Sequence, residues 1–237
     1  MGSDAGSETV ADGDGKSSRP MIVTLPVFSG DVARLRDLLA WILLLGGTRQ
    51  HRAVLVADCG MSAGDVFELK ELAQKAFLSV DIEVTDESVT GWPEGANALW
   101  LKAAKAAEAI GEEWLFLEPD AVPLRAGWLD AIDIHQRATA ARYMGALVPC
   151  STPGLPKLHM DGVGVYPPNA YAELAGIVAA NPKVAFDIST AAFVCKEARA
   201  CNLFQHLWGE KGNPPRFAEK GIPKTAVFDL DYIRPDA

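Results

Sequence analysis

The chain has 237 residues, of which 49% are hydrophobic and 22% are charged, and its formal net charge is -9. This is the composition of a globular protein that is large enough to bury a substantial core. The acidic balance excludes a global basic field for nucleic acid or for an anionic membrane surface. No apolar run reaches the roughly 18–20 residues of a membrane-spanning helix, so we expect no membrane partner.

Four cysteines, Cys59, Cys150, Cys195 and Cys201, show neither a CxxC pair nor the spacing of zinc ligands. A chain of this size does not need disulfides to stabilise its core, so we expect reduced thiols. The first residues lack a signal-peptide pattern. Together these features predict a cytoplasmic protein.

Residues 1–20 are rich in Gly, Ser and Asp and predict a disordered tail. From residue 21 onward, short apolar segments alternate with amphipathic ones, which indicates strands alternating with helices. Asp31 and Ser62 stand where N-caps are expected, and Gly111 stands where a helix ends. The predicted strands are 21–28, 51–60, 80–86 and 113–120. The predicted helices are 31–45, 62–77 and 93–111.

This alternation predicts an α/β fold whose parallel-rich sheet is covered by helices on both faces. Residues 145–237 contain many Gly and Pro residues and one further helical stretch near 169–180, which favours a mixed α+β half. His51 and His135 lie in polar surroundings, so we read both as surface residues.

Ligands of open parallel sheets bind beyond the carboxyl ends of the strands. Three such ends carry candidate groups: Thr24-Leu25-Pro26, Asp58 and Glu118-Pro119-Asp120. Two carboxylates one residue apart suit a hard cation such as Mg²⁺ or Mn²⁺. A solvated, proline-stiffened turn is an equal reading of the same residues, and an acid–base pair acting on a sugar is another.

Here the chain resembles a known family. The segment WLFLEPDAVPLRAGWLDAI is similar to the metal-binding strand and turn of GT-A-fold glycosyltransferases, with Glu-Pro-Asp in place of their usual DxD motif. The segments GANALWLKAAKAA, HMDGVGVYPPNAY, FDISTAAF and NLFQHLWG resemble the helix before that strand and the acceptor-side segments after it. The resemblance implies one GT-A-like domain over 21–237. Residues 21–120 would be its Rossmann-like, nucleotide-sugar-binding half, and 121–237 its acceptor and catalytic half.

The resemblance also implies roles for particular residues. Leu25, Pro26 and Val27 would surround the base and ribose, and Asp58 would accept a hydrogen bond from either. Asn97 would contact ribose or sugar, and Lys102 a phosphate. The alternatives are a turn residue for Asp58, a helix cap for Asn97 and a solvated helix face for Lys102. The implied donor site consists of Leu25, Pro26, Val27, Asp58, Asn97 and Lys102.

Glu118 and Asp120, completed by His206, would hold Mn²⁺ or Mg²⁺ in such a family member. Asp187 would be the catalytic base, with Asp161 as the second candidate. His206 lies among apolar residues and could instead be a packed histidine, with His159 as a weaker rival ligand. Asp187 could instead cap the helix that we expect to follow it.

The resemblance therefore predicts a metal-dependent glycosyltransferase that moves a sugar from a nucleotide-sugar to a hydroxyl, with a UDP-sugar as the favoured donor. The candidate acceptors are a small glycan, a protein hydroxyl and a hydroxymethylated pyrimidine of phage DNA. In the last case the location would be the host cytoplasm. No obligate protein partner is evident. The alternatives are a nucleotidyltransferase that makes a nucleotide-sugar and a non-catalytic nucleotide-binding domain. No GxGxxG follows a strand, which disfavours a dinucleotide oxidoreductase.

Overall fold

The computed structural model describes residues 20–87, 89, 91–149, 154 and 156–206. All but the last residue of the predicted tail lies outside this part of the chain. The strands are β1 (Ile22–Val27), β2 (Thr48–Ala57), β3 (Phe77–Val84), β4 (Trp114–Phe116), β5 (Ala121–Pro123), β6 (Tyr143–Pro149), β7 (Leu158–Tyr166), β8 (Ala198–Ala200) and β9 (Phe204–His206). The helices are η1 (Ser29–Asp31), α1 (Val32–Leu44), α2 (Ala63–Ala76), α3 (Glu94–Ile110), α4 (Trp128–Thr139), α5 (Ala170–Ala180), α6 (Phe186–Ser189) and α7 (Ala191–Val194).

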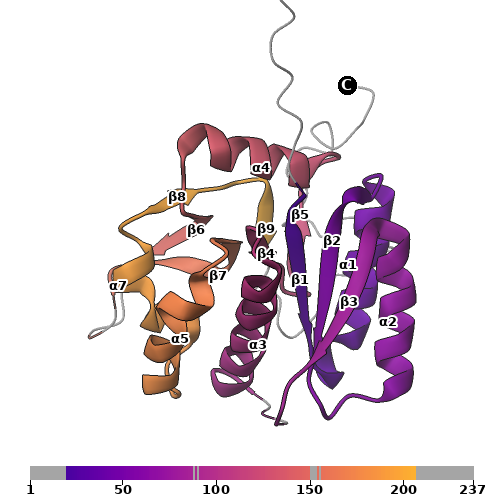
Figure 1. Cartoon of the computed structure of the whole chain (residues 1–237), viewed down its shortest axis with the longest axis horizontal. Helices are drawn as coiled ribbons and strands as arrows, with labels where there is room; N and C mark the ends of the chain where they lie inside the picture. Colours follow the sequence, from indigo (N-terminus) through magenta and orange to yellow (C-terminus); the bar gives the residue numbers. More distant parts are fainter. Residues whose placement is uncertain (1–19, 88, 90, 150–153, 155, 207–237) are drawn as a thin grey trace, which may run out of the picture.

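The main sheet has the strand order β3-β2-β1-β4-β7-β6-β8 (Figure 1). Its first four strands are parallel, and β7 then pairs antiparallel with both β4 and β6. The predicted βαβαβαβ order and the parallel-rich mixed sheet are confirmed. A second sheet pairs β5 with β9 in antiparallel register.

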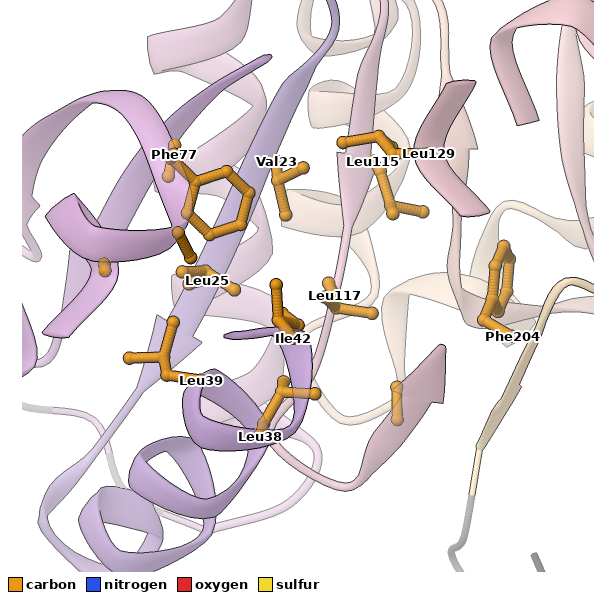
Figure 2. Close-up of a cluster of buried hydrophobic side chains, with 14 of the residues drawn as sticks. Val23, Leu25, Leu38, Leu39, Ile42, Phe77, Leu115, Leu117, Leu129 and Phe204 are labelled. Atoms are coloured by element: carbon orange, nitrogen blue, oxygen red, sulfur yellow. The ribbon is translucent and has the colours of Figure 1, made fainter. Parts of the chain in front are cut away.

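Alternation along β1 and β4 divides the core into two layers. Val23 and Leu25 face α1 and α2, whereas Ile22 faces α3. In the same way Leu115 joins the first layer and Phe116 the second. Figure 2 shows side chains of the first layer, and this buried cluster includes Phe204 of β9. The last described strand is therefore part of the core.

Local signals explain most helix ends. The hydroxyl of Ser62 accepts a hydrogen bond from the backbone N–H of Asp65, so it caps α2 as predicted. Gly111 ends α3 with a φ of 81°, a left-handed conformation that favours glycine. Asp31 occupies the N-cap position of α1, as predicted, but its side chain makes no capping hydrogen bond. Its carboxylate binds Arg34 instead, at 3.0 Å.

The helix expected after Asp187 is replaced by two short turns, α6 and α7. Asp187 lies inside the first turn of α6, so the reading of Asp187 as a helix cap is wrong. Among the described helices, none is both long and apolar enough to cross a membrane. The described cysteines, Cys59, Cys195 and Cys201, are free thiols, as expected.

His51 is buried, with 1% of its surface exposed, so the prediction of a surface residue is wrong. The reason is that β2 begins at Thr48 and includes His51. Its Nδ1 accepts a hydrogen bond from the backbone N–H of Met21 at 3.0 Å, and its Nε2 lies 3.0 Å from Asp130 of α4. The imidazole thus joins the starts of β1 and α4. His135 is exposed, as expected.

We expect His51→Ala to lower the free energy of unfolding by about 1–3 kcal/mol, because a buried backbone N–H loses its acceptor. Urea denaturation of the two proteins measures this difference. His135→Ala, a substitution of an exposed histidine on α4, should stay within about 0.5 kcal/mol of the parent chain. Equal losses in both variants would contradict a structural role for His51.

Candidate functional site

A cavity of about 310 Å³ opens at the carboxyl ends of β1 and β4. From β1 the chain leads through α1 to β2 on one side, while β4 lies on the other side. Ligands of α/β sheets bind at such a switch point. The described lining residues are Pro26, Phe28, Asp31, Arg34, Val89, Gly91, Trp92, Gly95, Ala96, Leu99, Phe116, Glu118, Pro119 and Asp120.

A tight turn after β4 carries two of the carboxylates. The backbone N–H of Leu117 donates to the carbonyl of Thr24 at 3.0 Å, which extends the pairing of β4 with β1. The N–H of Ala121 then donates to the carbonyl of Glu118 at 2.9 Å and closes a turn around Asp120. The structure thus places Glu118 and Asp120 together at the cavity.

Asp31 and Arg34 line the same cavity. Their side chains are 15% and 21% exposed, and Nη1 of Arg34 lies 3.0 Å from Oδ1 of Asp31. Burial, together with the charges of Asp120 and Glu118, raises the pKa of Asp31 to about 6, and the charge of Arg34 opposes this rise. Three acidic side chains, Asp31, Glu118 and Asp120, therefore line one cavity.

Glu118 and Asp120 fit a hard divalent cation by their chemistry, since Mg²⁺ is commonly held by one or two carboxylates together with waters and substrate phosphates. Within the described part of the chain, no three His, Cys, Asp or Glu side chains are grouped so that they could hold a metal ion by themselves. The backbone of His206 pairs with Ala121, the residue after Asp120. The side chain of His206 lies outside the described atoms. The topology therefore brings the predicted third ligand to the neighbouring strand.

Asp187 and Asp161 form a second acidic group, and the charge of Glu118 acts on both the first group and Asp187. Burial, together with the charges of Asp161 and Glu118, raises the pKa of Asp187 to about 7, against a 2.9 Å hydrogen bond from the N–H of Ile188. Nε2 of His159 lies 3.7 Å from Oδ2 of Asp187, and burial lowers the pKa of this histidine. A carboxylate with a pKa near neutrality is suited to act as a general base.

The predicted donor residues are only partly brought together. Pro26 lines the cavity, but the side chains of Leu25 and Val27 are fully buried in the core on the other face of the sheet. The physical reason is the two-residue period of a strand, which sends neighbours to opposite faces. Asp58 is 5% exposed, and its Oδ1 accepts a hydrogen bond from the N–H of Gly60 at 2.8 Å. It is absent from the described lining of the cavity.

Two residues of α3 lie away from the described lining of the cavity. The side-chain amide of Asn97 donates to the carbonyls of Pro182 and Val184, so it holds the segment that leads to α6. Lys102 lies 3.4 Å from Glu83 and 3.7 Å from Asp86, where it lines a different hollow. A phosphate contact for Lys102 is therefore not supported by its position.

The sequence reading missed the part of the site that follows β1. Arg34 was not singled out, and Asp31 was read only as a helix cap. The available signal was their i, i+3 spacing at the start of a helix that directly follows a strand end. Trp92 is 66% exposed at the cavity.

No family model matches the sequence, and no curated protein matches it. Solved structures do resemble it. The chain is similar to the glycosyltransferase GlyE of Streptococcus pneumoniae TIGR4, with 9% identity and a TM-score of 0.52 over 82% of this chain and 46% of GlyE. It is similar to an active-site mutant of LgtC, with 12% identity and a TM-score of 0.53 over 77% of this chain and 73% of LgtC.

A third similar structure is the mannosyltransferase PcManGT from Pyrobaculum calidifontis in complex with GDP-Man and Mn²⁺. Its identity is 14% and its TM-score 0.51, over 78% of this chain and 55% of PcManGT. The chain thus spans about half the length of GlyE and PcManGT. At such low identities the structural similarity shows the fold alone, and it confirms the predicted fold class. The chain therefore has the GT-A-type fold of glycosyltransferases.

Proposed function

We propose that this chain is a glycosyltransferase that moves a sugar from a nucleotide-sugar to a hydroxyl acceptor, with a divalent metal ion at the donor. One observation carries the proposal: Glu118 and Asp120 line a cavity at the switch point of a GT-A-type sheet. The complex of PcManGT with GDP-Man and Mn²⁺ supports both the donor class and the metal.

The cavity of about 310 Å³ has the polar and aromatic groups that a nucleotide needs. Phe28 and Trp92 offer ring faces on which a base or a sugar can stack, and Trp92 is 66% exposed. A UDP-sugar remains the favoured donor from the sequence. PcManGT was solved in complex with GDP-Man, so uridine and guanosine nucleotides must both be tested to identify the base of the donor.

Glu118 and Asp120 would hold Mn²⁺ or Mg²⁺, with His206 as the proposed third ligand. A bound cation offsets the negative charge that develops on the departing diphosphate. Both carboxylates line the cavity in which the donor phosphates would bind.

Asp187 is the proposed general base, and Asp161 is the alternative. Its carboxylate would take the proton of the acceptor hydroxyl as that oxygen attacks the sugar. Three features support this role: Asp187 is 17% exposed at its side chain, its pKa is raised to about 7, and Glu118 is close enough to influence it. The acceptor would then bind between α6 and the carboxylate turn.

The acceptor itself is a hydroxyl compound: a glycan, a protein side chain or a modified base of DNA. The net charge of -9 gives no general attraction for DNA, so we place a sugar or protein hydroxyl first. A nucleotidyltransferase would need several basic side chains to bind a triphosphate. Among the described residues that line the cavity, Arg34 is the one basic side chain. A non-catalytic domain would bind a nucleotide without turning it over.

Thermal unfolding with UDP, GDP and their sugar conjugates, with and without Mn²⁺, tests the donor site. A ligand at a hundred times its Kd stabilises the native state by about 2.7 kcal/mol. For a domain of this size, that raises Tm by about 5–10 °C. We expect one nucleotide to give this shift only with Mn²⁺, and Asp120→Asn to abolish it.

Asp81→Asn is the matched control, because Asp81 is exposed on β3 and absent from the described cavity lining. This variant should keep the full shift. If no nucleotide stabilises the unmodified chain in Mn²⁺, the donor site is wrong. If a nucleotide stabilises the chain but no sugar is transferred or hydrolysed from its conjugate, the non-catalytic alternative is favoured.

A further inference from the structure

The charge of the donor cavity is unbalanced. Asp31, Glu118 and Asp120 contribute three carboxylates, whereas Arg34 is the one basic side chain among the lining residues that the structure describes. A nucleoside diphosphate is itself an anion, so it would be repelled from such a cavity unless positive charge lay next to its phosphates. A metal ion at Glu118 and Asp120 would supply part of this charge.

Arg34 lines the same cavity and is held by the protein. It belongs to the first turn of α1, and its guanidinium is held 3.0 Å from Oδ1 of Asp31. Its side chain is 21% exposed, so it is positioned by the protein and still reached by solvent. The guanidinium presents its N–H groups in a planar fork that matches phosphate oxygens.

A second arginine on the same helix provides the comparison. Arg36 lies two residues further along α1, and both of its bonds, at 2.7 Å, go to the carboxylate of Glu68 on α2. These two side chains are 41% and 48% exposed, and neither is among the described lining residues. Of these two arginines of α1, Arg34 is therefore the one whose position on the helix brings it to the cavity.

The geometry points to Arg34 as the phosphate-binding side chain of the donor cavity, an inference that rests on the proposed function. Arg34 binds the donor diphosphate from α1, whereas the metal ion would be held by the carboxylate turn after β4. Asp31 keeps the guanidinium at the cavity before the donor arrives. The diphosphate is then held by two groups, and only one of them depends on a metal ion.

Isothermal titration of the full chain with UDP and GDP, and with uridine and guanosine, tests this assignment in Mn²⁺ and in EDTA. For the nucleotide that binds, we expect Arg34→Met to weaken the affinity for the diphosphate about tenfold to a hundredfold. The affinity for the nucleoside, which lacks phosphates, should change less than twofold. Arg34→Lys keeps the charge but not the fork, so it should lose less than Arg34→Met.

Arg36→Met is the matched control and should bind both ligands as the unmodified chain does. If Arg34→Met is folded and binds the diphosphate as tightly as the unmodified chain, the assignment of Arg34 is wrong and the proposed function stands. Equal losses for nucleoside and diphosphate would also overturn it, because Arg34 would then support the cavity as a whole. If the unmodified chain binds neither UDP nor GDP, the donor site fails, and this assignment fails with it.

Discussion

Asp187→Asn is expected to reduce sugar transfer about a hundredfold to ten-thousandfold and, at pH 8, to make the protein more stable. The activity is lost because an amide cannot take the proton of the acceptor hydroxyl. In the unmodified chain, the transfer rate should rise as the pH passes through about 7, where Asp187 loses its proton. The side chains of Asp and Asn have nearly the same shape, so the Oδ1 acceptor for the N–H of Ile188 is kept.

The opposite effect on stability follows from the raised pKa. The pKa of Asp187 is about 7 in the folded protein against a reference value of 3.8, so between these values the folded state binds more protons than the unfolded state. Stability therefore falls as the pH rises from about 4 to about 7, and it is level above that range. Asparagine has no proton to lose and removes this penalty, which amounts to at most about 4 kcal/mol at pH 8.

The measurement is chemical denaturation at pH 4 and pH 8 in EDTA, so that no metal ion alters the charge near Glu118. Asp31, whose pKa is raised to about 6, contributes a slope of the same sign that ends at lower pH, and it is present in both proteins. Asp81→Asn, at an exposed site, should leave the pH dependence unchanged. A variant at Asp187 that gains nothing at pH 8 would show that this carboxylate is not desolvated in solution.

Gly162→Val is expected to lower the free energy of unfolding by about 3 kcal/mol and transfer by about a hundredfold. A Cβ at Gly162 would lie 2.8 Å from Cζ of Phe186 and 3.6 Å from Oε1 of Glu118. The ring of Phe186 has little room to retreat, since it stacks on Trp100 at 5.2 Å and meets Phe116 edge-on at 5.5 Å. Its displacement would move the next residue, the proposed base.

Gly176→Val is the matched control. Gly176 lies within α5, and a Cβ there meets nothing within 4 Å. Valine has a higher helix propensity than glycine, so this variant should be as stable as the unmodified chain or slightly more stable. Urea denaturation and a transfer assay on both variants give the comparison. If Gly162→Val keeps full activity, the close packing between β7 and α6 does not position the base.

Much of the segment 21–120 could be predicted from the sequence. Its strands and helices carry local signals: apolar runs, the 3.6-residue period, Ser62 as a cap and Gly111 as a helix end. The carboxylate turn was also visible, because Glu118 and Asp120 follow an apolar strand directly. Parallel order then places strand ends at one edge, which is enough to predict where a ligand binds.

The second half gave weaker signals. The strands β8 and β9 have three residues each and were not predicted. Their positions depend on pairing with β6 and β5, which are distant in the sequence. The helix expected after Asp187 was wrong because packing on β7 divides this segment into two short turns. Local propensity does not contain such long-range contacts.

By itself, the sequence determined the α/β class, the order of the first elements and the presence of two carboxylates at a strand end. Only the tertiary structure decided which side chains share the cavity. It placed Leu25 and Val27 in the core, brought Arg34 to the same cavity as Asp120, and placed Asp187 within the electrostatic reach of Glu118. The physical reason is that periodicity reports which face of an element is apolar, whereas a site depends on which elements meet and in what register.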